Sequence, residues 1–117
     1  MFTVAAILFA IAAVGGLTMA YIHFSRATHP PIPLALVHGL FGAAGLVVLL
    51  IALMQTGVAG LGALALGIIV VAALGGFYLF SLHLRKRPLP SAVVLIHGAV
   101  AATGFVVLLA AILQTSG

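Results

Sequence analysis

Four apolar runs dominate this sequence, and each is long enough to cross a lipid bilayer. They cover residues 2–24, 32–54, 58–84 and 92–113. Because about 20 apolar residues span the hydrocarbon core as a helix, and because the core offers the backbone no water, runs of this length must be helical. The sequence therefore predicts an all-α integral membrane protein, a four-helix bundle in which residues 1–117 form a single transmembrane domain.

Composition excludes a water-soluble domain and several kinds of chemistry. Only 3% of the 117 residues are charged, and Asp, Glu and Cys are absent. A soluble domain needs far more charge on its surface. Without an acid or a cysteine the chain cannot assemble a nucleophilic triad, and its glycines lie inside apolar runs and not in a phosphate-binding loop. We therefore expect no independent catalytic activity and interpret the protein as an electron carrier or a subunit.

The positive charges indicate how the chain is oriented in its membrane. Two short proline-containing loops, residues 25–33 and 85–91, follow the first and third runs. By the positive-inside rule these loops face the cytoplasm and both termini lie outside, as in a bacterial plasma membrane protein. We interpret cations confined to two loops mainly as determinants of membrane topology and secondarily as contacts for lipid headgroups. Their confinement to these loops argues against nucleic-acid binding. All four lie in these loops: Arg26, Arg85, Lys86 and Arg87.

The chain is an internal duplication of a two-helix hairpin. Repeat 1 covers about residues 1–57 and repeat 2 about residues 58–117, and the two share the pattern H-G-x-x-x-A-x-G-x-V-V-L-L-x-A-x-x-Q-T, which begins at His38 and at His97. Since each repeat holds two spans, both enter the membrane from the same side. We therefore expect parallel repeats related by a pseudo-twofold axis along the membrane normal.

Histidines inside the apolar runs are the candidate functional residues. A polar ring in hydrocarbon costs free energy unless it is bonded, so His38 and His97 indicate a functional site. His23 and His83 occupy matching places near the ends of the first and third runs. The sequence predicts that these four form one layer near the cytoplasmic face, whereas His29, which has no counterpart in repeat 2, is predicted to be a solvated loop residue.

A glycine lies seven residues deeper in the membrane than each of these four histidines. Seven residues are nearly two helical turns, so glycine and histidine share a helix face. Two explanations remain open: small residues allow close helix packing, or they leave volume for a large planar ligand held by the imidazole. The four glycines are Gly16, Gly45, Gly76 and Gly104.

Haem b is the planar ligand that suits these residues. Two neutral imidazoles are standard axial ligands of haem iron, so His38 and His97 would hold one haem between facing helices. A second haem, or a metal ion, held by His23 and His83 is an alternative of lower rank. Partners for the propionates would come from the cytoplasmic rim: His23, His83, Arg26 and Arg85.

In layout, these paired histidines and glycines resemble the small four-helix membrane b-type cytochromes. The resemblance implies a bis-histidine haem near the cytoplasmic face and electron transfer with quinone or a larger membrane complex. It departs from the two-haem pattern in which one helix carries two haem-binding histidines. Electron exchange near one face of the membrane is therefore favoured over electron transfer across it. Two alternatives stay open: an accessory subunit of a respiratory or photosynthetic complex, and a four-histidine metal-binding membrane protein, each alone or as an oligomer.

Overall fold

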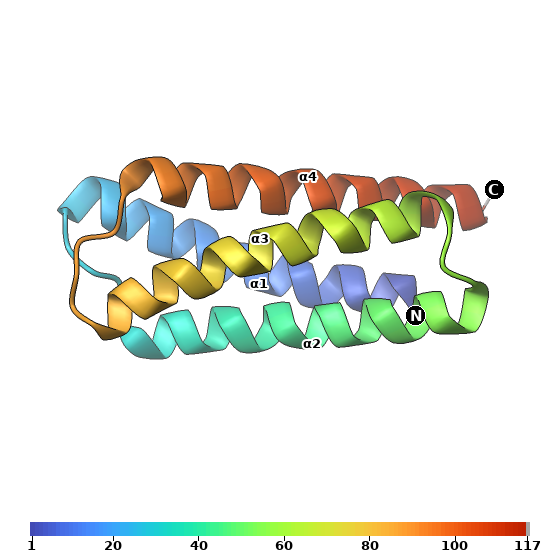
Figure 1. Cartoon of the computed structure of the whole chain (residues 1–117), viewed down its shortest axis with the longest axis horizontal. Helices are drawn as coiled ribbons and strands as arrows, with labels where there is room; N and C mark the ends of the chain where they lie inside the picture. The colour runs from blue at the N-terminus through green and yellow to red at the C-terminus, as the bar shows by residue number, and fades with distance from the viewer. Residues whose placement is uncertain (117) are drawn as a thin grey trace.

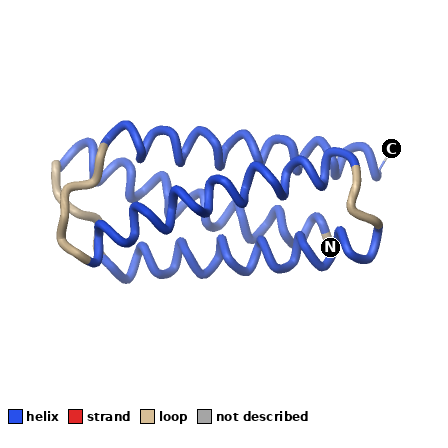
Figure 2. The backbone as a smooth tube through the Cα atoms, in the orientation of Figure 1, coloured by secondary structure: helices blue, strands red, loops and turns tan. Residues whose placement is uncertain are grey.

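The structure, a computed structural model that describes residues 1–116, consists of four α-helices joined by short loops. Residue 117, the last of repeat 2, lies outside the described residues. No strand occurs within residues 1–116 (Figure 2). The all-α prediction is confirmed, and each helix boundary falls within three residues of its predicted place. The helices are α1 (Phe2–Arg26), α2 (Ile32–Thr56), α3 (Gly60–Leu84) and α4 (Ser91–Ser116).

The helices pack as an antiparallel bundle of two hairpins with principal extents of 44 × 19 × 19 Å (Figure 1). A 25-residue helix is about 37 Å long, which exceeds the bilayer core. All four helices are long and apolar enough to cross a membrane, as predicted. α1 packs closely along α2, and α3 along α4, whereas contacts between the hairpins are fewer. We call this looser boundary between the two repeats the seam.

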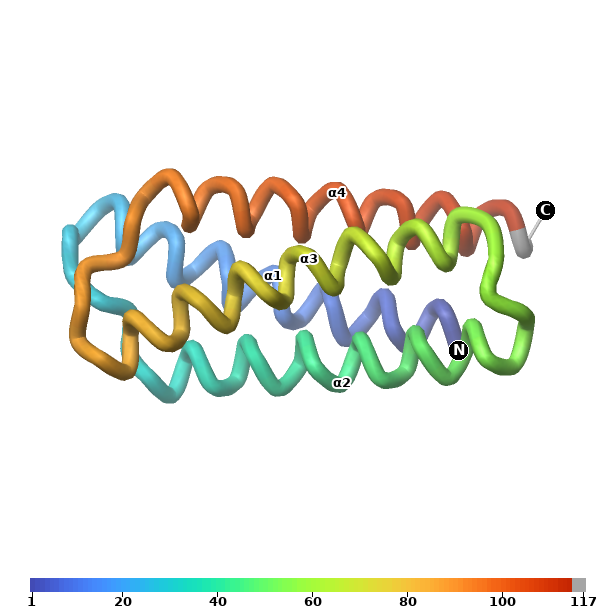
Figure 3. Tube along the Cα trace, viewed as in Figure 1, coloured from blue at the N-terminus to red at the C-terminus, as the bar shows by residue number. Residues whose placement is uncertain are grey.

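Both basic loops lie at one end of the bundle, and the α2–α3 loop and the termini lie at the other (Figures 1 and 3). At the basic end, α1 ends where Ala27 adopts a left-handed conformation with φ 50°. After α3, Lys86 is likewise left-handed, with φ 54°, and the N–H of Arg87 bonds the carbonyl of Leu82 at 2.9 Å. These turns direct the chain across the end of the bundle toward the next helix.

Small side chains make up about half of the buried apolar residues, and many large apolar side chains face outward. These small buried side chains are alanines, among them Ala5, Ala65 and Ala111, whereas Leu17 and Met54 are 72% and 71% exposed. In a membrane, apolar side chains gain nothing from leaving lipid, so helices associate by close packing of small residues. This distribution fits a bundle whose outer surface contacts lipid.

The apolar core lies in the half of the bundle near the termini. Its centre contains Leu49, Leu53 and Leu108, each nearly inaccessible. The two repeats contribute an aromatic residue to the core from different helices. In repeat 1 the core contains Phe9 of α1 and Leu46 of α2, whereas the matching positions in repeat 2 are Ile69 of α3 and Phe105 of α4. The other half of the bundle, toward the basic loops, contains the histidines.

Candidate functional site

His38 and His97 form a pair of imidazoles in the interior of the bundle, one from each repeat. His38 lies on α2 and His97 on α4. Their ring centroids are 6.2 Å apart and their planes are nearly perpendicular, at 85°. Both rings are half-buried. The structure therefore brings together the two residues that the sequence predicts to share a ligand.

Each of these rings is held by a backbone carbonyl of the preceding helix. His38 Nδ1 lies 2.7 Å from the carbonyl oxygen of Ala12, and His97 Nδ1 lies 2.7 Å from that of Ala72. Since a carbonyl oxygen can only accept, each Nδ1 must carry the proton and donate it. A carbonyl oxygen has two lone pairs, so it can accept this bond in addition to its helical one.

The carbonyl contacts leave the second nitrogen of each imidazole available. In a neutral ring whose Nδ1 is protonated, Nε2 has a free lone pair. Nε2 of His38 and Nε2 of His97 make no hydrogen bond within residues 1–116. A metal-binding histidine commonly donates its other N–H to a carboxylate or a backbone carbonyl, which fixes the tautomer and ring orientation. The site therefore presents two oriented donor nitrogens.

Glycines of α1 and α3 make this approach of the histidines sterically possible. A Cβ atom at Gly16 would lie 3.0 Å from His38 Cε1, and one at Gly76 would lie 3.1 Å from His97 Cε1. The neighbouring Gly15 and Gly75 also lie beside these rings. Gly16 and Gly76 thus make room for the imidazole of the adjacent helix. They do not leave an open volume beneath His23 and His83, which is what the seven-residue spacing suggested.

Gly45 and Gly104 have a packing role in this structure. A Cβ atom at Gly45 would come within 2.7 Å of the Phe9 ring, and one at Gly104 within 2.6 Å of Ile69. The volume below His38 and His97 is therefore filled by side chains of α1 and α3. Of the two explanations open from the sequence, close helix packing accounts for these two glycines.

His23 and His83 do not join the central pair. His23 Nε2 and the Ser91 hydroxyl oxygen are 3.1 Å apart, a hydrogen bond that links α1 to α4. His83 is 7% exposed and makes ring contacts with Phe80 and His29. No three histidines within residues 1–116 are close enough to hold one metal ion. His23 and His83 therefore do not form one cluster with His38 and His97, because they lie against partners on different helices and loops.

His29 is not the solvated loop residue that the sequence predicted. Its Nε2–H donates to the carbonyl oxygen of Arg87 at 2.6 Å. Its ring stacks on His83 with a centroid separation of 5.2 Å and an interplanar angle of 18°. The prediction failed because His29 has no counterpart in repeat 2, so its position depends on how the two repeats meet.

The predicted rim cations Arg26 and Arg85 are exposed at the basic end of the bundle. The Arg85 guanidinium donates to the carbonyl and hydroxyl oxygens of Ser81, at 3.3 and 3.4 Å. Arg26 makes no side-chain hydrogen bond or ion pair within the described residues. Both are therefore open to an anionic group from outside the chain.

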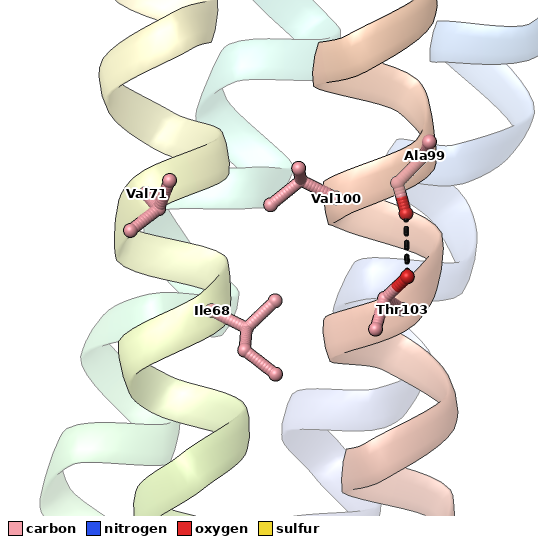
Figure 4. A pocket seen from close by; sticks show the side chains of 5 residues that line it. All are labelled: Ile68, Val71, Ala99, Val100 and Thr103. Atoms are coloured by element: carbon pink, nitrogen blue, oxygen red, sulfur yellow. Dashed lines mark hydrogen bonds between the residues drawn. The ribbon is translucent and has the colours of Figure 1, made fainter.

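Two hollows of the bundle lie away from the histidines. A groove of about 360 Å³ between α3 and α4 is lined by apolar side chains and by Thr103, whose hydroxyl bonds the Ala99 carbonyl at 2.8 Å (Figure 4). The matching positions of Ala99 and Val100 in repeat 1 are the bulkier Leu40 and Phe41. The second hollow, of about 310 Å³, lies near the termini. Neither is lined by a donor group suited to a metal or a redox cofactor.

Sequence reasoning missed the carbonyls of Ala12 and Ala72, which orient the two central imidazoles. The sequence did contain a pattern that includes these two alanines: Ala-Ala-x-Gly-Gly occurs in both repeats, at residues 12–16 and 72–76. Comparison of the chain with protein-family models, with curated proteins and with solved structures found no match.

Proposed function

We propose that this protein binds one haem b between His38 and His97 and transfers electrons within the membrane. The observation that carries the proposal is the paired arrangement of two imidazoles from different repeats, each oriented by a backbone carbonyl through Nδ1. Bound haem supplies a reversible one-electron couple. In this site His38 and His97 would hold the iron, and the carbonyls of Ala12 and Ala72 would fix the tautomers of the two rings.

The separation of the rings supports coordination of one metal ion by both. Zinc–imidazole bonds, which represent first-row metals, are about 2.0–2.1 Å long, and a ring centre lies about 1.1 Å behind its bonding nitrogen, so rings on opposite sides of one ion are about 6.3 Å apart. The observed separation is 6.2 Å. Because a ligated ion lies in the plane of each imidazole, perpendicular planes can share an ion on the line where they meet.

The seam between the repeats is the place where a porphyrin would lie. His38 and His97 belong to different repeats, so a group held between them lies between the two hairpins. Contacts across this boundary are fewer than those within either hairpin. Making room for a porphyrin therefore requires a shift of one hairpin against the other and leaves the packing within each hairpin intact.

The rim of the bundle suits the charged edge of haem. Arg26 and Arg85 are exposed and would bond the propionates, while His83 is buried against His29 and is less suited to this role. With the basic loops on the cytoplasmic side, the haem lies near that face, and its electron partner would be quinone or another protein there. A single haem is favoured over two because His23 and His83 have separate partners.

The electron paramagnetic resonance spectrum of the oxidised protein tests this proposal. Ligand planes that are nearly perpendicular leave two iron d orbitals close in energy, which gives a strongly anisotropic low-spin signal with a large highest g value. We expect this signal in protein purified with haem. A high-spin signal alone would show that His38 and His97 do not both ligate the iron.

Substitution of Gly16 with alanine is expected to weaken haem binding. The new Cβ would lie 3.0 Å from His38 Cε1 and push the imidazole from its position, whereas a Cβ at Gly15 would lie 3.5 Å from His38 Cβ, an ordinary contact. Because displacement of a ligand by a fraction of an ångström costs binding free energy, we expect about tenfold weaker haem binding for Gly16→Ala, a loss of about 1.4 kcal/mol. Haem titration monitored in the Soret region measures this change.

Gly15→Ala is the matched control for this substitution, since it adds the same methyl group one residue away. We expect its affinity for haem to remain close to that of the unmodified protein. Equal affinities of the two variants would contradict the role assigned to Gly16.

A further inference from the structure

The two basic loops are fastened to each other at the end of the bundle. His29, from the α1–α2 loop, donates to the Arg87 carbonyl in the α3–α4 loop and stacks on His83 at the end of α3. We call these three residues the histidine clasp. His29 is half-buried and the adjacent Pro30 is buried, so the first loop is folded onto the bundle. The clasp therefore joins repeat 1 to repeat 2 at the basic end.

The clasp concentrates positive charge that nothing in the chain neutralises. Arg26 lies three residues before His29, and Lys86 is adjacent to Arg87. The sequence contains no Asp or Glu. Within residues 1–116, the side chains of Arg26, Lys86 and Arg87 make no hydrogen bond or ion pair. Like charges that are held close together repel, so this end of the protein favours an anion from outside the chain.

The shape of the clasp excludes a metal ion as the ligand. An ion bound by an imidazole lies in the ring plane, but the planes of His29 and His83 are stacked nearly parallel, at 18°. Stacked planes cannot share a coordinated ion between them, and the nearby cations would repel one. A negatively charged group with several acceptor oxygens is the chemical complement of unpaired arginine and lysine side chains.

We propose that the histidine clasp assembles the two basic loops into a binding site for the phosphodiester headgroup of an anionic phospholipid. The loops directly follow helices long enough to cross the bilayer, so they lie at the depth of the headgroups. Basic clusters at this depth attract anionic lipids by about 1 kcal/mol per cation. The clasp adds a geometric requirement, because cations from both loops must be held together. This inference does not depend on haem.

Spin-labelled lipids provide the test. The full-length protein is placed in phosphatidylcholine vesicles, and the association of labelled phosphatidylglycerol is compared with that of labelled phosphatidylcholine. We expect the unmodified protein to prefer phosphatidylglycerol. This preference should fall about fivefold in each of the single variants Lys86→Gln and Arg87→Gln, which remove one cation each. His29→Leu keeps every cation but breaks the clasp, and should lower the preference at least about twofold.

The controls separate the clasp from net charge. Ser25→Ala removes a hydroxyl at the end of α1 that bonds the Tyr21 carbonyl and no residue of the clasp, so this variant should keep the preference. An unchanged preference in His29→Leu, with helical circular dichroism intact, would overturn the proposal by showing that charge alone attracts the lipid. Loss of the preference on addition of inorganic phosphate, but not of sulfate at equal ionic strength, would overturn it in favour of a free-phosphate site.

Discussion

Replacement of His38 or His97 with alanine is expected to abolish haem binding. In the proposed site each imidazole would supply one nitrogen to the iron, and its contact with the carbonyl of Ala12 or Ala72 leaves Nε2 unprotonated for that role. Loss of either ring would remove an iron ligand of the proposed site, and no third histidine within residues 1–116 is placed to replace it. Absorbance of the purified variants in the Soret region, normalised to protein, measures the effect.

His29→Ala and His23→Ala are the matched controls for these variants. Both residues are histidines at the same end of the bundle, but their rings bond Arg87 and Ser91 and do not contact the central pair. We expect both variants to keep the haem content of the unmodified protein. Full haem content in His38→Ala and in His97→Ala would exclude these two residues as the ligands.

Gly45→Leu is expected to cause the largest loss of stability among the glycine substitutions. The added Cβ would lie 2.7–2.9 Å from three atoms of the Phe9 ring, inside a closely packed interface between α1 and α2. Overpacking of this kind typically costs about 1–3 kcal/mol, and a whole leucine side chain should reach the upper end of that range. Unfolding of the protein in mixed micelles of increasing denaturing detergent measures the difference.

Two further variants identify the cause of that loss. Gly42 lies on the same helix, and nothing would contact a Cβ there within 4 Å, so Gly42→Leu should leave stability nearly unchanged. Combining Gly45→Leu with Phe9→Ala removes the ring that the leucine meets and should recover much of the lost stability. Haem content should follow folding in all these variants. A stable Gly45→Leu protein that lacks haem would instead restore the explanation that Gly45 makes room for the porphyrin.

The fold was predictable from the sequence because length and proline placement decide it. Apolar runs of this size can only cross the membrane as helices, and the prolines at Pro30, Pro31 and Pro33 separate the first two. The equivalence of His38 and His97 was predictable for a related reason. A duplicated hairpin places matching residues symmetrically, whatever the details of packing between its helices.

The contacts between the repeats were not predictable, because they depend on features that differ between the two halves. His23 bonds Ser91, but the residue that matches Ser91 in repeat 1 is Ile32, so His83 has no equivalent bond. His83 instead stacks on His29, whose own counterpart is Pro88. The role of the glycines stayed open for a related reason: a helical register shows which face a glycine occupies, but not which neighbouring side chain fills the space.

Visible absorption of the purified protein is the most direct test of the central claim. The protein should be produced in cells supplied with haem, purified in mild detergent, and examined first oxidised and then reduced with dithionite. We predict a sharp Soret band, resolved α and β bands on reduction, and one haem per chain by pyridine haemochrome. A colourless preparation with the helices intact would contradict the assignment of His38 and His97 as haem ligands.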